Sequence, residues 1–269
     1  MPVAGKYGRR EPKRAPAMQA SRWLGVKAQY SYPNAVDYLA RTGPGWNMLG
    51  NDSAADCVSV TWANARRVVT SATGTPSYPG QDQVWTFYKT QNPGFDPNGS
   101  SQTNGPGSRE DNGMDIQTAL EALVRDGGPD GVKAVAFGQV DVKNVPQVKF
   151  ALDVFGYLWT GINVLDANMA QFGSSQPWDY VTPAVPEGGH SVLTGGYGPK
   201  RPGALGGDER FITWAQETSF TDSFWQHQAE EAWVCIWPEH LSTAAFQAGV
   251  NQQALIADFH QLTGRALSL

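Results

Sequence analysis

The sequence predicts an α+β protein in which the helices come first and the strands follow. In the first half, apolar side chains recur at helical spacing within segments that end at capping or stop residues. In the second half, short segments rich in β-branched and aromatic residues lie between turn residues. Helices and strands do not alternate along the chain. This order argues against the doubly wound folds that bind nucleotides.

Four helices are expected in the first half and one near the carboxyl terminus. The first covers residues 57–73, and Asp56 or Ser53 could cap its start. Asp115 opens a later helix, which two glycines end. The expected helices cover residues 57–73, 81–90, 115–126, 144–156 and 251–262.

Strands are expected only from residue 157 onward. The pattern there is typical of strands because branched and aromatic side chains fit a pleated, half-buried surface. The expected strands cover residues 157–164, 190–197, 210–215 and 231–237.

The composition indicates a globular protein with a sizeable core. The chain has 269 residues, of which 41% are hydrophobic and 17% charged, and this excludes disordered, collagen-like and coiled-coil proteins. No apolar run approaches the ~18 residues that a membrane span needs. No apolar segment follows the basic residues at the start, so we expect no signal peptide and a cytoplasmic location in the producing cell. The two cysteines are too few for a disulfide framework.

Residues 1–29 are expected to form a basic N-terminal arm. The net charge of the whole chain is −5, yet the arm is strongly positive, so the rest of the chain is acidic. An arm of this charge suggests an anionic partner, although a solvated tail has the same composition. The charged residues of the arm are Lys6, Arg9, Arg10, Lys13, Arg14, Arg22 and Lys27, with Glu11 as the one acid.

Common cofactor and metal motifs are missing from the sequence. It contains no Walker-type phosphate loop and no dinucleotide fingerprint. Residues 96–98 begin like a calcium loop, but the required glycine and terminal glutamate do not follow. The four histidines lack the spacing of a zinc site. We expect no cofactor and no metal.

Cys57 and His190 are the candidate catalytic pair. Cys57 lies at the start of an expected helix, where unpaired N–H groups and the peptide dipoles stabilise a thiolate. His190 opens an expected strand after two glycines and could act as the base. For an arbitrary pair, the ordinary interpretation is a buried cysteine that packs as a small hydrophobe and a histidine with structural partners.

The strings around these two residues resemble the papain-like cysteine peptidases. The segment HSVLTGGYG (190–198) is similar to the histidine strand of that family, and FITWAQ (211–216) is similar to the strand that carries its N-S-W-G motif. Asn51 stands six residues before Cys57, where the family places the amide of its oxyanion hole. The stretch 38–238 is also similar to papain-like proteins of actinobacteria and their phages, which share GND…DC and GGHSV segments.

This resemblance implies a fold and a division of the chain. Residues 30–240 are expected to form the papain-like domain, with a helical half (30–156) that carries the cysteine helix and an antiparallel β half (157–240) that carries the histidine strand. Residues 241–269 are expected to be a C-terminal helical tail.

The sequence departs from the family at the third catalytic group. The family places Asn or Asp two residues before the tryptophan of its motif, and Ile212 stands there in this chain. An aliphatic side chain cannot hold the imidazole tautomer. Gln216, Thr213 or Asp208 would have to replace the amide, and we rank Gln216 first because it is an amide on the same segment.

Two functions of different classes remain open at this point. The first is a cysteine peptidase or amidase that acts on a peptide or protein through a Cys57–His190 thiolate and an acyl-enzyme. The alternative is a catalytically silent structural protein of a phage virion, in its capsid or tail, bound through residues 1–29 and the Gly/Asn-rich loop 92–114. Nucleic acid is not an expected partner, because the acidic body carries no recognised binding module.

Overall fold

An antiparallel sheet organises the described part of the chain. The computed structural model describes residues 4–13, 15, 17–25, 31–99, 110–199 and 209–269. Seven strands form the sheet in the order β2-β7-β3-β4-β5-β6, and the short β1 pairs with β4. The strands are β1 (Val36–Asp37), β2 (Ala136–Val140), β3 (Leu158–Leu165), β4 (Pro186–Tyr197), β5 (Glu209–Thr213), β6 (Gln216–Phe220) and β7 (Ala229–Ile236).

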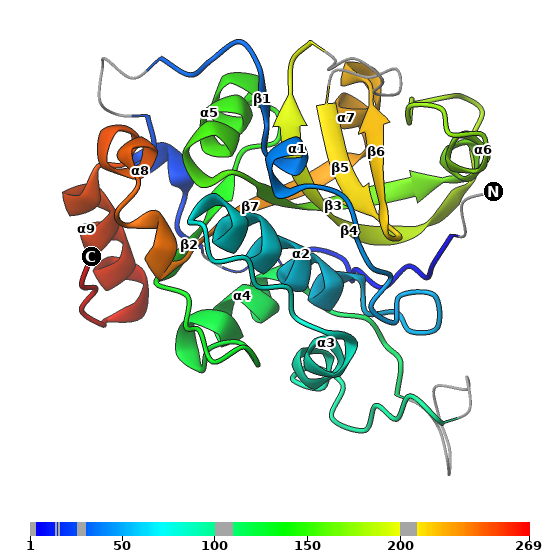
Figure 1. Ribbon diagram of the computed structural model, residues 1–269, viewed down its shortest axis with the longest axis horizontal. Coiled ribbons are helices and arrows are strands. Elements are labelled where there is room, and N and C mark those ends of the chain that lie inside the picture. Colours follow the sequence, from blue (N-terminus) through cyan, green and yellow to red (C-terminus); the bar gives the residue numbers. More distant parts are fainter. Residues whose placement is uncertain (1–3, 14, 16, 26–30, 100–109, 200–208) are drawn as a thin grey trace.

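Helices surround this sheet (Figure 1). Helix α2 packs across β4 and β3, and α3 and α4 pack against α2. The α-helices are α1 (Tyr38–Thr42), α2 (Cys57–Ala72), α3 (Gln81–Tyr88), α4 (Ile116–Arg125), α5 (Val145–Phe155), α6 (Asp166–Gly173), α7 (Asp222–Gln228), α8 (Ala244–Gly249) and α9 (Gln252–Thr263). The 3-10 turns are η1 (Ala20–Arg22) and η2 (Pro238–His240).

The predicted α+β class is confirmed, but the predicted order is only partly met, because β2 lies between two helices and α6 and α7 lie between strands. All five predicted helices are present as α2, α3, α4, α5 and α9, and the four predicted strands are β3, β4, β5 and β7. The side chains of Asp115 and Asn144 cap α4 and α5 by accepting backbone N–H bonds. Strand β2 was not expected: it lies between two helices and pairs with β7 at the edge of the sheet. Its five residues include a glycine, which leaves too short a pattern to predict a strand.

The start of α2 differs from the prediction in one respect. Asp56 occupies the N-cap position, but its carboxylate accepts no capping hydrogen bond, and the Ser53 hydroxyl donates to the Gly50 carbonyl oxygen. The Asp56 side chain is instead fully buried near Asn51 and Trp85. Burial raises the pKa of Asp56 well above its usual range, and these neighbouring donors only partly oppose the rise.

Asp56→Asn should stabilise the fold at neutral pH. The pKa of Asp56 is higher in the folded state than in the unfolded chain, so its stabilising contribution is complete below the unfolded pKa and is lost as the pH rises toward the folded pKa. Asparagine keeps the shape and cannot ionise. We expect the free energy of unfolding at pH 7 to increase by about 1–2 kcal/mol, and the gain to shrink toward zero near pH 4.

Denaturant unfolding at the two pH values measures this difference. The matched control is Asp52→Asn, because Asp52 is exposed four residues away. An equal gain at both pH values would show that packing, and not ionisation, accounts for the change.

Candidate active site

Helix α2 brings Cys57 to the face of strand β4. Cys57 is the first residue of the helix and is buried. One turn later, the Thr61 hydroxyl bonds the Cys57 carbonyl oxygen at 2.9 Å and the Ser191 hydroxyl of β4 at 2.9 Å. The backbone N–H of Ser191 also lies against the Cys57 sulfur. These contacts place the thiol beside the strand residue next to His190.

His190 is held from one side by Thr213. The His190 Nε2 atom and the Thr213 hydroxyl oxygen are 2.7 Å apart, and both residues are buried. The other ring nitrogen, Nδ1, has no hydrogen-bond partner within the described ranges. If the Thr213 oxygen accepts the Nε2 proton, Nδ1 is left as a lone-pair acceptor. This is the form of histidine that can take a proton from a thiol.

The contact from Thr213 bears on the third catalytic group. Ile212 pairs with Leu193 of β4, and its side chain lies in the core on the opposite face of β5. Thr213, the next residue, therefore faces His190. Gln216 pairs with Thr213 across the β5–β6 turn and makes no side-chain hydrogen bond to a described residue. Asp208 lies outside the residues that the structure describes. A catalytic role for Gln216 stays a prediction.

A tight turn next to Thr213 holds an aromatic ring over the imidazole. Trp214 and Ala215 connect β5 to β6 with φ angles of 44° and 62°. Such angles are unfavourable for residues with a Cβ atom, yet a two-residue hairpin of this kind requires them. The ring centroids of Trp214 and His190 are 4.8 Å apart. Trp214 thus forms one wall of the site.

Asn51 lies at the site and already binds a peptide group. Its side-chain N–H donates to the carbonyl oxygen of Lys6 at 3.1 Å and to that of Ala54 at 3.1 Å. In return, the backbone N–H of Lys6 donates to the Asn51 carbonyl oxygen at 2.6 Å. The amide predicted to stabilise an oxyanion therefore holds a carbonyl oxygen of the N-terminal arm.

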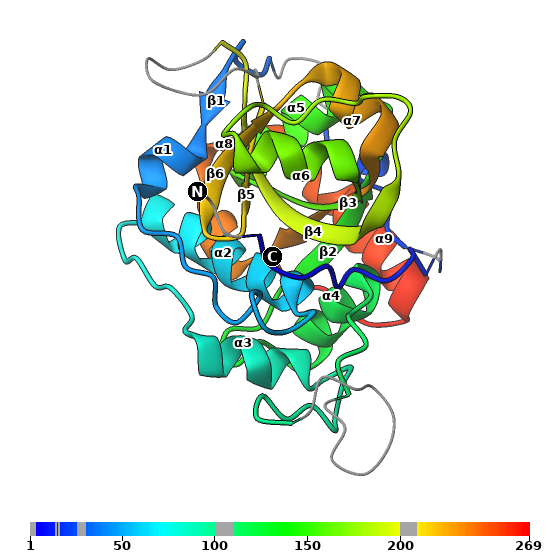
Figure 2. The same ribbon diagram turned by 90° about the vertical axis from the view of Figure 1, so that its right-hand side faces the viewer.

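The arm crosses the site between the two halves of the molecule. Figure 2 shows it as the dark blue segment that runs between α2 and α4 on one side and β3 and β4 on the other. The Tyr7 ring packs edge-on against His190, with centroids 6.0 Å apart, and also contacts Trp214. The backbone N–H of Gly8 lies against the Cys57 sulfur. The arm thus covers both candidate catalytic side chains.

Two glycines allow this close approach. A Cβ atom on Gly5 would lie 2.4 Å from the Trp214 ring. A Cβ atom on Gly8 would lie 1.8 Å from the Ala55 carbonyl oxygen, which leaves no room for any side chain. Sequence reasoning missed this docking, although the spacing of Gly5 and Gly8 within the arm is a signal that could have suggested it.

The positive charge of the arm is paired with the acidic body of the same chain. The ion pairs that the structure describes for it are Lys6–Asp111, Arg9–Glu230, Arg9–Glu231, Lys13–Glu121 and Arg22–Asp258. Their N–O distances lie between 2.6 and 3.4 Å. An anionic partner for this arm is therefore present within the molecule itself.

Burial keeps both candidate catalytic groups uncharged while the arm is in place. Burial raises the pKa of the Cys57 thiol to about 12, and the backbone N–H groups of Ser191 and Gly8 oppose this only in part. Burial also lowers the pKa of His190 to about 3, and the nearby Arg9 cation lowers it further. Both shifts disfavour a thiolate–imidazolium pair while the arm is in place.

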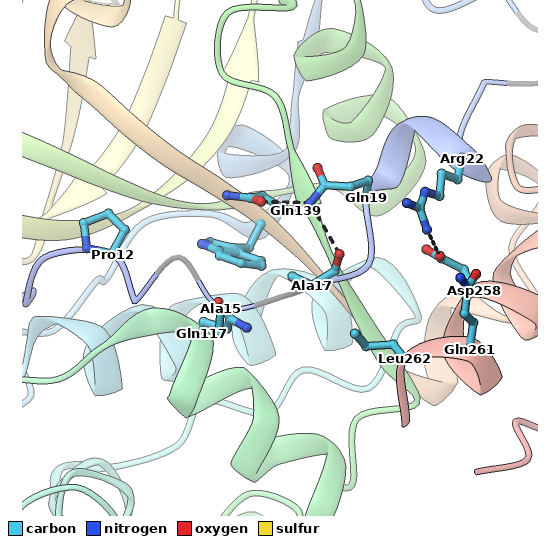
Figure 3. A pocket seen from close by; sticks show the side chains of 11 residues that line it. Pro12, Ala15, Ala17, Gln19, Arg22, Gln117, Gln139, Asp258, Gln261 and Leu262 are labelled. Carbon is cyan, nitrogen blue, oxygen red and sulfur yellow. Dashed lines mark hydrogen bonds and ion pairs between the residues drawn. The ribbon is translucent and has the colours of Figure 1, made fainter. Parts of the chain in front are cut away.

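A separate cavity lies further along the arm. Its volume is about 650 Å³. Figure 3 shows residues of α4, β2 and α9 on its walls and the Arg22–Asp258 ion pair at one side. None of the candidate catalytic residues lines it. No group of His, Cys, Asp or Glu side chains in the described ranges could hold a metal ion. No described helix is long and apolar enough to cross a membrane.

The arrangement of sheet and helices is similar to that of solved cysteine protease structures. Xylellain, a cysteine protease from Xylella fastidiosa, superposes with a TM-score of 0.62 at 14% identity, over 88% of this chain and 98% of xylellain. A procathepsin B from Trypanosoma congolense superposes with a TM-score of 0.54 at 11% identity, over 86% of this chain and 80% of its own. No protein-family model and no curated protein sequence matches. The chain has the fold of the papain-like cysteine proteases.

Proposed function

We propose that the protein is a cysteine peptidase or amidase whose own arm keeps it inactive. One observation carries this proposal: the Asn51 amide binds a backbone carbonyl oxygen of the arm, whose next residue packs on His190, so the site accepts a peptide in an extended segment. His190 supplies the base: its Nε2 atom contacts the Thr213 hydroxyl, and its Nδ1 atom has no partner among the described residues and can accept a proton. A protein that serves only as a scaffold needs none of these features.

The residues present supply each step of an acyl transfer. His190 Nδ1 takes the proton of the Cys57 thiol, and the thiolate sulfur attacks the carbonyl carbon of an amide or ester. The Asn51 side-chain N–H and the backbone N–H of Cys57, which has no partner within the helix, stabilise the oxyanion. The leaving amine takes the proton from His190, and a thioester remains on Cys57. Water, activated by His190, then hydrolyses the thioester and restores the thiol.

The arm must leave before this chemistry can start. It occupies the Asn51 amide and covers Cys57 and His190, so a substrate cannot enter. Exposure to water would reverse the effect of burial on both pKa values and allow a charged pair to form. The alternative, a silent structural protein of a virion, predicts that Cys57 behaves as an ordinary thiol even when the arm is released.

Gly8→Ala should release the arm and activate Cys57. The new Cβ atom would overlap the Ala55 carbonyl oxygen, so the segment around Gly8 has to move out of the site. We expect iodoacetamide to alkylate Cys57 at least about tenfold faster than in the unmodified chain at pH 7, because the thiolate is the reactive form. The rate is measured by mass spectrometry of the Cys57 peptide, which separates it from the buried Cys235.

Matched variants decide between the enzyme and the scaffold. Gly173→Ala is the control, since its Cβ atom meets nothing within 4 Å. For the enzyme, alkylation in the Gly8→Ala chain should remain fast down to pH 5–6 and lose this low-pH rate when His190 is changed to Ala. In the opposite outcome, the alkylation rate rises with pH as for an ordinary thiol with a pKa of ~8.5, and stays unchanged when His190 is changed to Ala. The protein then has no activated cysteine, and the scaffold interpretation stands.

Thr213→Val should weaken the low-pH reactivity of Cys57 in the Gly8→Ala chain. Valine has the shape of threonine but cannot bond Nε2 of His190, so the tautomer and ring position are no longer fixed. We expect the alkylation rate at pH 6 to fall by about tenfold, and Thr213→Ser to restore it. Gln216→Ala is tested in parallel. Should Gln216→Ala cause the loss and Thr213→Val leave the rate unchanged, Gln216 would be the positioning residue.

A further inference from the structure

The buried Arg9 side chain of the arm fills an acidic pocket beside the candidate active site. Its guanidinium has no exposed surface and pairs with Glu230 at 2.7 Å and Glu231 at 3.2 Å. The Nη2 atom that pairs with Glu230 also donates to the Asn163 side-chain oxygen at 2.8 Å and to the Ile162 carbonyl oxygen at 3.4 Å. Two carboxylates and two further oxygens therefore converge on one planar cation.

The walls of this pocket are built to admit a long, flat side chain. A Cβ atom on Gly161 of β3 would lie 2.7 Å from Cδ of Arg9, so any larger residue there would obstruct the side chain. The carboxylate of Glu231 is fixed from behind, because its second oxygen accepts from the Trp233 indole at 2.7 Å. The side-chain N–H of Asn163 donates to Glu230 in the same way. The carboxylates are thus positioned by partners other than Arg9 as well.

The pocket adjoins the position where a peptide backbone meets Cys57. Gly8, whose N–H lies against the sulfur, is the residue before Arg9. The backbone N–H of Arg9 donates to the Gly189 carbonyl oxygen at 3.0 Å, next to His190, and Arg9 forms an isolated parallel bridge with Met114. These backbone contacts on both sides of Arg9 orient its side chain into the acidic pocket.

Of the two carboxylates, the buried one of Glu231 depends most on a cation, whereas Glu230 is exposed. Within the described ranges, Arg9 is the only cation that forms an ion pair with either of them. The Glu231 side chain is buried, and an unpaired charge in such a position is unfavourable. A guanidinium suits the pocket best, because its planar donors match two carboxylates and a backbone oxygen together.

We propose that this pocket, formed by Asn163, Glu230 and Glu231, binds the side chain of an arginine or lysine in the peptide substrate, close to the bond that is cleaved. The proposal rests on the proposed function, and it names the substrate class: peptides with a cationic residue beside the scissile bond. Arg9 of the arm occupies the place of that substrate residue.

The binding step can be tested without catalysis. Arg9→Ala in the full chain empties the pocket, and N-ethylguanidinium, which has the end group of the missing side chain, is added as the probe. We expect it to raise the melting temperature in a saturable way, whereas neutral N-ethylurea of the same shape does not. Glu231→Gln in the Arg9→Ala chain should weaken this binding at least about tenfold. The proposal would be overturned if the two compounds raised the melting temperature equally, or if Glu231→Gln left the binding of N-ethylguanidinium unchanged.

The substrate step is tested in the Gly8→Ala chain, which also serves if Arg9→Ala does not fold. The substrates are pairs of peptides. The two members of a pair have arginine or its neutral analogue citrulline at one position, and each position around the scissile bond is tested in turn. We expect kcat/KM to be at least about tenfold higher for arginine in one position, and the preference to disappear with Glu231→Gln. Cleavage without any preference would refute the pocket and leave the proposed function intact. Probe binding in a chain that cleaves nothing would refute the substrate role and the proposed function together.

Discussion

The Ser191 hydroxyl joins the two halves of the site, because it bonds a helix and a strand at once. The Thr61 hydroxyl of α2 and the Trp159 indole of β3 each lie 2.9 Å from it. All three groups are buried, so an unmade bond among them would be costly. This interaction fixes the rotation of α2 against β4. The start of α2, with Cys57, is thereby held against the segment of β4 that carries His190, and a slip of one residue on β4 would turn His190 to the other face.

The arm uses the geometry that this junction creates and changes its electrostatics. With the arm in place, water is excluded, and the neutral forms of Cys57 and His190 are favoured. Arg9 adds to this effect, since its charge opposes protonation of His190. The residues that occlude the site thus also favour the uncharged forms of Cys57 and His190. Removal of the arm restores both access and the conditions for a charged pair.

Much of the site could be predicted from local strings, because its members lie at the ends of regular elements. Cys57 starts a helix with a clear periodic pattern, and His190 lies in a strand with a clear branched pattern. The family spacing pointed to Asn51. Thr213 could not be singled out, because the choice between it and Gln216 depends on how β5 alternates and on which residues form the turn. Sequence reasoning ranked the amide for its chemistry alone.

The arm could not be placed from its charge alone. Net charge indicates that an anionic partner exists, but not whether the partner lies in another molecule or in the same chain. The acids that pair with the arm are scattered in the sequence from Asp111 to Asp258, and only the folded chain brings them next to the arm. Strand β2 was missed for a similar reason: its pairing with β7 is a contact between distant segments, which short local patterns do not encode.

Tethering decides how such a site is opened. A segment bound within its own chain competes at an effective concentration that is millimolar for short flexible links. A free basic peptide at micromolar concentration would therefore rarely displace Arg9 from Glu230 and Glu231, even with equal contacts. Added salt would also have little effect, since the Arg9 pair is buried and poorly screened. Cutting the arm removes this advantage, and so does an anionic partner that binds Arg9 more tightly than the pocket does. An anionic partner for the arm and a catalytic role for Cys57 are therefore compatible, because the first would release the second.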